Sequence, residues 1–136
     1  MRLGIDLGTT RTVVARVDRG NYPVLTFLDA DGDPHEHIPS VVALREGAVV
    51  YGFEAVAAER EGASTLRSFK RILGDPSTTP HSVVEVGDLT LPLTEVLVGF
   101  LRALRHEIEQ VIDPDVDSPE LEAVVSVPAH AHTTQR

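Results

Sequence analysis

The apolar pattern of residues 94–112 restricts the possible folds of this chain more than any other segment does. Its apolar residues recur at the spacing of an amphipathic helix, Glu95 lies in the first turn where a negative charge is favourable, and Asp113-Pro114 ends the pattern. The predicted apolar face consists of Leu97, Leu101, Leu104, Ile108 and Val111. In a chain of 136 residues, 42% of them apolar, we expect this long helix to pack on a single core.

Short apolar segments rich in β-branched residues predict strands on both sides of this helix. Before it, the strands are predicted at residues 3–7, 12–17 and 24–28. We expect these three to be antiparallel and the polar segment 29–36 to form a loop. After the helix, residues 121–127 form another apolar strand, which Pro128 stops. This order predicts an α/β fold with a mixed sheet, in which ligands bind beyond the strand ends.

The middle of the chain combines short strands with short helices. Strands are predicted at 39–44 and 48–51, helices at 53–61 and 64–73, and a hairpin at 83–86 and 89–91. Gly74 ends the second helix, so Lys70 is expected in its last turn.

The charge balance excludes a generic nucleic-acid coat. The 21 acidic residues outnumber the 12 basic ones and leave a formal charge of −9, whereas nucleic-acid affinity depends on clustered Lys and Arg. Without cysteine, the chain has no disulfide, thiolate metal site or cysteine nucleophile. It also contains no apolar run long enough for a membrane helix and no signal-peptide stretch, so we expect a cytoplasmic protein that does not bind a membrane.

The segment Gly4-Ile5-Asp6-Leu7-Gly8-Thr9-Thr10 is typical of a phosphate-binding hairpin. Glycine at position 8 lets backbone N–H groups approach an anion, the two threonine hydroxyls add donors, and Asp6 can hold a hydrated Mg²⁺. The alternative is a polar turn in which the threonines satisfy local backbone groups. A carboxylate inside an apolar strand favours the phosphate interpretation, because a buried, unpaired carboxylate needs a partner such as a cation.

Two His-x-His pairs raise a second hypothesis. His35 and His37 would share one face of an extended segment, as would His130 and His132, and together the pairs could in principle bind zinc. No pattern predicts that the pairs approach each other. We therefore favour solvated loop histidines.

Four segments, in order along the chain, resemble motifs of the 70-kDa heat-shock (DnaK-type) chaperones, a branch of the actin-like ATPase superfamily. Residues 4–10 are similar to the first phosphate motif, and Ile38-Pro39-Ser40-Val41-Val42 is similar to the Pro-Ser-Val segment. Phe69-Lys70-Arg71-Ile72-Leu73-Gly74 resembles the catalytic-lysine segment. Val125-Ser126-Val127-Pro128-Ala129, followed by Gln135-Arg136, resembles the Val-Pro-Ala segment.

The resemblance implies that residues 1–136 are the N-terminal portion of an ATPase domain with a ribonuclease H-like fold and a small inserted subdomain at about 38–91. It implies that Gly8, Thr9, Thr10 and Arg11 contact the phosphates of ATP or ADP and that Asp6 holds Mg²⁺ through water. It further implies that Lys70 acts in catalysis.

A lysine suits that role because phosphoryl transfer needs positive charge near the γ-phosphate and a flexible ammonium can also orient water. The other basic residues are all arginines, which makes Lys70 distinctive. The alternative is a cation that complements the C-terminal end of a helix dipole.

Arg71, Pro128 and Arg136 match residues that couple nucleotide state to the peptide-binding domain in the resembling family. The resemblance implies that the complete protein binds unfolded peptides, a J-domain co-chaperone and a nucleotide exchange factor. We expect the 136 residues alone to hydrolyse ATP barely or not at all, and to self-associate to some extent through the exposed face of the lobe. The alternatives are an actin-like or a sugar-kinase-like ATPase lobe.

Overall fold

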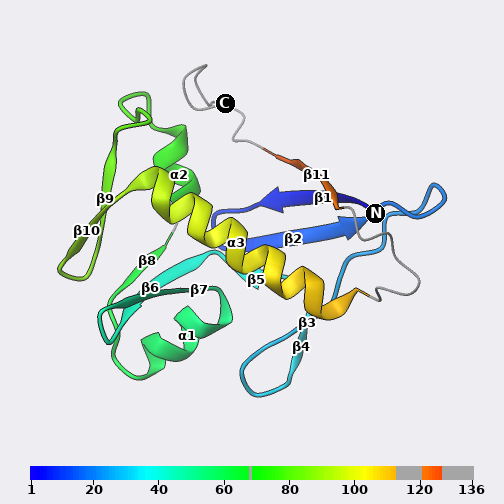
Figure 1. Cartoon of the computed structure of the whole chain (residues 1–136), viewed down its shortest axis with the longest axis horizontal. Helices are drawn as coiled ribbons and strands as arrows, with labels where there is room; N and C mark the ends of the chain where they lie inside the picture. Colours follow the sequence, from blue (N-terminus) through cyan, green and yellow to red (C-terminus); the bar gives the residue numbers. More distant parts are fainter. Residues whose placement is uncertain (68, 113–120, 127–136) are drawn as a thin grey trace.

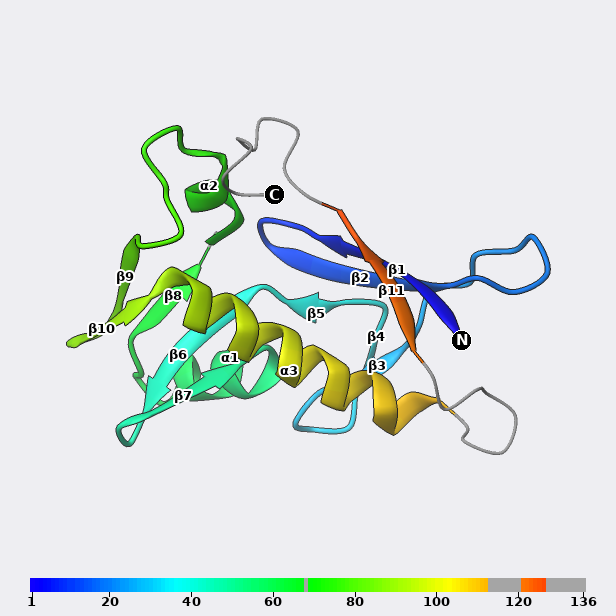
Figure 2. The ribbon, with the colours of Figure 1, turned by 45° about the horizontal axis from the view of Figure 1, so that its top comes forward.

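The computed structural model describes residues 1–67, 69–112 and 121–126, and for residues 69–71 it describes the backbone alone. The strands β1 to β7 precede the first helix, and the long helix α3 (Leu93–Val111) lies across two separate sheets (Figures 1 and 2). The mixed α/β class predicted from the sequence is confirmed. The ribonuclease H-like lobe and the inserted subdomain at about 38–91 stay predictions.

The larger sheet has the strand order β11-β1-β2-β5. β1 (Arg2–Leu7) pairs antiparallel with β2 (Arg11–Arg16), and β2 pairs antiparallel with β5 (Ile38–Pro39). β11 (Glu122–Val125) returns after α3 to pair parallel with β1. A parallel pair needs a long connection, and here that connection carries α3 over one face of the sheet (Figure 2).

The strand predicted at 24–28 is wrong over part of its length. Val24 makes a single β-bridge with Ala15 of β2, and Pro23 beside it has no N–H with which to extend the ladder. The chain then forms β3 (Phe27–Leu28), which pairs with β4 (Pro34–His35) as a small hairpin of its own. The segment predicted as a plain loop therefore contributes a strand.

The smaller sheet has the order β7-β6-β8. β7 (Ala48–Tyr51) and β8 (Thr65–Arg67) both pair antiparallel with β6 (Val41–Arg45). The strand predicted at 39–44 is in fact divided at Ser40, so that β5 belongs to the larger sheet and β6 to the smaller one.

Both faces of β6 are buried, which explains its continuous apolar sequence. Val42 belongs to the main hydrophobic core. Val41 and Ala43 face the other way and pack with two alanines of α1 (Phe53–Arg60) in a second, smaller cluster. β6 therefore joins the two clusters.

The helix predicted at 64–73 is wrong in its first part, where the chain forms β8, and α2 (Phe69–Gly74) occupies the rest. Glu59 of α1 holds β8 in place, because its carboxylate accepts one hydrogen bond from the Thr65 hydroxyl at 3.1 Å and one from the Arg67 guanidinium at 2.6 Å. These tertiary contacts and the free edge of β6 override the local preference for a helix.

The hairpin predicted after α2 is confirmed by β9 (Val83–Val86) and β10 (Leu89–Pro92). Gly87 in its turn has a φ of 63°, in the left-handed region that favours glycine. β10 leads directly into α3.

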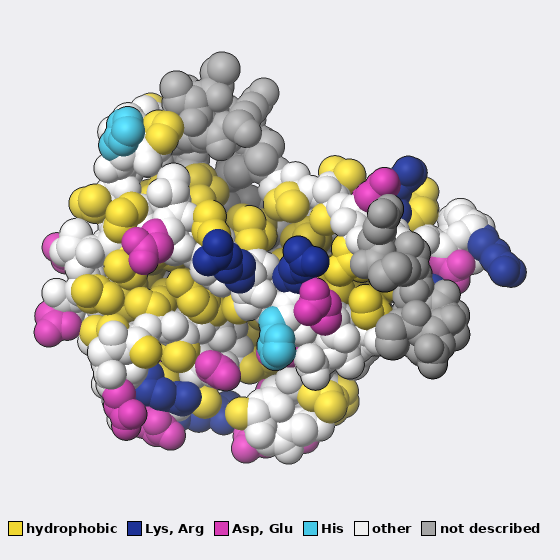
Figure 3. All heavy atoms as spheres, viewed as in Figure 1, with side chains coloured by type: hydrophobic (Ala, Val, Ile, Leu, Met, Phe, Trp, Pro, Cys, Tyr) yellow, Lys and Arg dark blue, Asp and Glu magenta, His cyan; other side chains and the backbone are white. Residues whose placement is uncertain are grey.

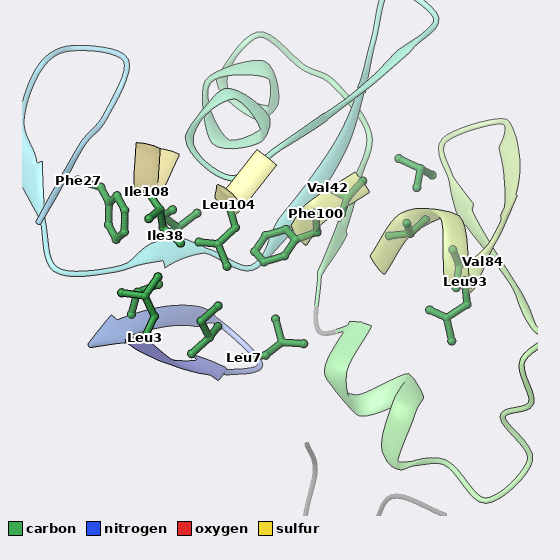
Figure 4. Close-up of a cluster of buried hydrophobic side chains, with 14 residues drawn as sticks. Leu3, Leu7, Phe27, Ile38, Val42, Val84, Leu93, Phe100, Leu104 and Ile108 are labelled. Carbon is green, nitrogen blue, oxygen red and sulfur yellow. The ribbon is translucent and has the colours of Figure 1, made fainter. Parts of the chain in front are cut away.

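α3 supplies the largest share of the core (Figure 4). Its buried side chains, three and four residues apart, are Leu93, Val96, Phe100, Leu104 and Ile108. They form one cluster with apolar side chains of β1, β2 and β6 and with Phe27 of β3 and Ile38 of β5.

The buried face of α3 differs from the predicted one. Leu104 and Ile108 are buried as expected, but Leu101 is 38% exposed and Val111 is 37% exposed. Phe100 takes the central position instead, because its ring reaches the smaller sheet and meets Tyr51 edge to face, with 6.5 Å between the ring centroids.

Hydrophobic side chains also reach the surface, as Figure 3 shows for the face seen in Figure 1. None of the helices formed by the described residues is long and apolar enough to span a membrane.

A matched pair of leucines tests the position of the buried face. We expect Leu104→Ala to lower the free energy of unfolding by about 2–5 kcal/mol, because Leu104 is only 2% exposed and its loss leaves a cavity. Leu101→Ala should lower the free energy of unfolding by less than about half of the loss caused by Leu104→Ala. Urea unfolding followed by circular dichroism measures both values, and equal losses would contradict the assignment.

Gly99 of α3 gives a second test. A Cβ added at Gly99 would overlap the hydroxyl and ring of Tyr51. Alanine is intrinsically better in a helix by about 1 kcal/mol, yet we expect Gly99→Ala to destabilise the protein by about 1–3 kcal/mol through overpacking. In a Tyr51→Leu background the same change should be neutral or stabilising. Thermal unfolding of the four proteins measures this coupling, and stabilisation of the wild-type background by Gly99→Ala would refute it.

Candidate functional site

The alternation of β1 places Asp6 on the face of the sheet that α3 does not cover. Leu3, Ile5 and Leu7 are buried in the core, whereas Gly4 and Asp6 point to the opposite face. Asp6 is exposed there, at one end of a shallow hollow of the sheet surface. The expectation that this carboxylate is buried is therefore wrong, because the Asp6 side chain is accessible to solvent.

Ser126 is a partner of Asp6 that the sequence did not reveal. Its hydroxyl donates a hydrogen bond to Asp6 Oδ1 at 2.9 Å, and its N–H donates to the carbonyl of Ile5 at 2.8 Å. The two residues are far apart in sequence and meet because β11 runs parallel to β1, so that both strands end at the same edge. Only the register of this pairing identifies Ser126.

The turn between β1 and β2 requires glycine at position 8. A Cβ built on Gly8 would collide with the main-chain carbonyl oxygen of Arg11. Any other residue would therefore force the turn to open.

The two threonines of this turn are available to a ligand. Thr9 is partly exposed and Thr10 is exposed. In the part of the chain that the structure describes, neither residue donates a hydrogen bond from its N–H or its hydroxyl. The alternative interpretation, in which these groups satisfy local backbone atoms, is therefore not supported by the geometry of the turn.

The Pro-Ser-Val segment supports the turn from behind. Ser40 N–H donates to the carbonyl of Thr10 at 3.1 Å, and the buried hydroxyls of Ser40 and Thr12 are 3.0 Å apart. Arg11 lies opposite Pro39 in the β2–β5 register and is exposed. These contacts hold the start of β2 while leaving the Arg11 side chain at the surface.

His37 contributes no charge of its own beside the turn. Burial lowers the pKa of the His37 imidazole below its ordinary value, and the charges of Arg11 and His35 lower this pKa further. Because the imidazole is uncharged at neutral pH, Arg11 provides the positive charge on this side of the turn.

Helix α2 lies beside the β1–β2 turn in both views (Figures 1 and 2). Ile72 and Leu73 pack against the main core and anchor it. Lys70 is the second residue of α2 and not in its last turn, which corrects the prediction. A cation at the start of a helix gains nothing from the helix dipole, so the dipole alternative for Lys70 no longer applies.

The other predicted site residues are placed only in part. Arg71 follows Lys70 in the backbone of α2. Pro128 and Arg136 lie outside the described residues, as do His130 and His132. The structure thus brings together Asp6, the turn at 8–11 and the backbone of α2. The coupling role of Arg71, Pro128 and Arg136 stays a prediction.

Comparison with known proteins identifies the family. The model of the family described as Hsp70 protein matches residues 2–136. The chaperone protein DnaK of Mycoplasmopsis agalactiae is 32% identical over 134 residues, which is 98% of this chain and 20% of that protein. The DnaK of Halobacterium salinarum is 30% identical over 135 residues, with the same coverage of both chains.

A chaperone protein HscA homologue of Paracidovorax citrulli is 35% identical over 153 residues, covering 98% of this chain and 23% of that protein. The chain thus spans about a fifth of the length of the curated relatives that it matches. The match over nearly all of its residues shows that the chain belongs to the Hsp70 protein family.

Proposed function

We propose that this chain is a nucleotide-binding part of a DnaK-type molecular chaperone and that the β1–β2 turn binds the phosphates of ATP or ADP. The observation that carries the proposal is the turn itself. Gly8 permits a close approach of backbone, while Thr9 and Thr10 present N–H and hydroxyl donors that have no partner among the described residues. The exposed guanidinium of Arg11 adds a positive charge.

The same edge of the sheet suits a magnesium ion. Mg²⁺ keeps most of its waters and binds through one or two carboxylates, and the exposed Asp6 carboxylate, oriented by Ser126, fits that requirement. When bound, the ion would supply positive charge to the phosphate oxygens. Asp6 would hold it through water molecules.

Lys70 is the residue we assign to catalysis in the longer protein. Its place in the first turn of α2, beside the β1–β2 turn, is compatible with an ammonium that approaches the terminal phosphate and orients water.

We assign the wider activity to a longer protein, because the curated relatives are about five times as long as this chain. We propose that it hydrolyses ATP in the cytoplasm to drive binding and release of unfolded peptides, together with a J-domain co-chaperone and a nucleotide exchange factor. Arg71, Pro128 and Arg136 would couple the nucleotide site to the peptide site. The family match favours this function over an actin-like or sugar-kinase-like ATPase lobe.

Self-association of the 136 residues also stays a proposal. The face of the larger sheet that carries Asp6 is apolar around Val13, Ala15 and Val124, and Val124 is 70% exposed. Apolar surface of this kind favours contact between copies.

Binding of Mg·ATP tests the phosphate site directly. Titration of the ¹⁵N-labelled 136-residue chain should shift the amide signals of residues 8–11 first. Thr10→Ala should weaken binding about tenfold, because a hydrogen bond to a charged group contributes about 1.5 kcal/mol. Gly8→Ala should weaken it at least as much, since its methyl group displaces the turn.

Thr90→Ala is the matched control, because Thr90 is an exposed threonine in β10, away from the turn. It should bind Mg·ATP like the wild type. Equal loss in Thr10→Ala and Thr90→Ala, or amide shifts confined to other parts of the sheet, would refute the assignment.

Turnover gives an independent prediction. We expect the 136 residues to hydrolyse ATP barely above the uncatalysed rate, because positioning by both sides of a cleft supplies most of the catalysis in phosphoryl transfer. Phosphate release measured with purified protein tests this expectation. Robust turnover that Lys70→Ala abolishes would show that the chain is a complete enzyme.

A further inference from the structure

A small pocket lies between the β3–β4 hairpin and helix α1, apart from the β1–β2 turn. Its volume is about 110 Å³. His35 and His37 line it together with two carboxylates, Asp29 and Asp31, and with Phe53 of α1. The pocket thus gathers nitrogen and oxygen ligands of the kinds that transition metals prefer.

The two imidazoles have a spacing that suits one shared ion. Their ring centroids are 5.5 Å apart and the rings meet edge to face at 67°. Two imidazoles bound to one tetrahedral zinc, with Zn–N distances of about 2.0–2.1 Å, have centroids roughly 5 Å apart. The spacing of the two rings is therefore compatible with one shared ion, provided that rotation of the side chains turns one nitrogen of each ring toward it.

Asp29 already orients His35 as the carboxylate partner of a metal-binding histidine does. His35 Nε2 lies 2.8 Å from Asp29 Oδ2, and because a carboxylate only accepts hydrogen bonds, Nε2 carries the proton. This tautomer leaves Nδ1 with a lone pair for a ligand. Phe53 packs against the His35 ring at 5.3 Å between centroids and limits its rotation.

Asp29 is itself fixed. Its Oδ1 accepts the N–H groups of Asp31 and Asp33, each at 2.9 Å, so the hairpin cannot rearrange without losing these bonds. The orientation of His35 is thus built into the backbone of the hairpin.

Carboxylates outnumber guanidinium groups around the pocket in the part of the chain that the structure describes. The carboxylates of Asp29, Asp31 and Asp33 lie close together. Two guanidinium groups offset part of this negative charge: Arg60 Nη1 is 3.6 Å from Asp31 Oδ2, and Arg11 acts on His37. The Asp31–Arg60 pair is exposed and adds little stability, so the Asp31 carboxylate can turn to an ion at small cost.

We propose that His35 and His37 bind one divalent transition-metal ion, with Zn²⁺ as the best fit, that Asp31 supplies a third ligand, and that Asp29 positions His35. This site is separate from the proposed phosphate site and does not depend on nucleotide binding. The site needs only the pair His35 and His37 and does not require the second pair, His130 and His132.

Titration of the untagged 136-residue chain with zinc chloride in a calorimeter tests the proposal. We expect one equivalent of Zn²⁺ to bind, and His35→Gln and His37→Gln each to weaken binding at least tenfold. His81→Gln and His106→Gln are matched controls, because both histidines are exposed and far along the chain from the pocket. They should bind like the wild type.

A measurement on the wild type covers the case in which a variant fails to fold. The imidazole ¹H and ¹⁵N signals of His35 and His37 should shift on addition of Zn²⁺, while those of His81 and His106 stay in place. In the metal-free protein, the ¹⁵N signals of His35 should report the Nε2–H tautomer, and Asp29→Asn should remove this preference.

Three outcomes would overturn the proposal. The first is absence of saturable Zn²⁺ binding below about 100 μM. The second is full binding in both His35→Gln and His37→Gln. The third is loss of binding in a His130→Gln/His132→Gln double variant, which would show that the other His-x-His pair holds the metal.

Discussion

The packing of α3 against two sheets at once is the constraint on which the rest of the structure depends. Leu104 and Ile108 meet the larger sheet, while Phe100 reaches the smaller one beside Tyr51. Gly99 lets Tyr51 lie directly against the helix. Because one helix must satisfy both surfaces, its buried stripe is centred on Phe100 rather than on the leucines that the apolar pattern favours.

This packing also decides where the candidate phosphate site lies. With α3 on one face of the larger sheet, the period of two along β1 sends Leu3, Ile5 and Leu7 into the core and leaves Asp6 on the open face. The connection through α3 then returns β11 parallel to β1, which brings Ser126 to Asp6. The core and the site thus follow from the same alternation.

Residues 29–40 link the candidate phosphate site and the proposed metal site. At one end, Asp29 and His35 organise the pocket that we assign to a metal ion. At the other, Ser40 supports the β1–β2 turn through Thr10 and Thr12. Only a few residues separate these contacts along the chain, and the charge of Arg11 accordingly adds to burial in lowering the pKa of His37.

The sequence by itself determined the features that depend on neighbouring residues: the helix at 94–112, the hairpin at 83–91, and a turn at Gly8 that suits phosphate. The order of the four motifs along the chain also indicated the family. Only the tertiary structure decided that residues 65–67 form a strand, that Lys70 lies in the first turn of its helix, that Leu101 is exposed and that Ser126 meets Asp6. Local patterns report propensity and periodicity, whereas these four features depend on which surfaces and strand edges come together across distant parts of the chain.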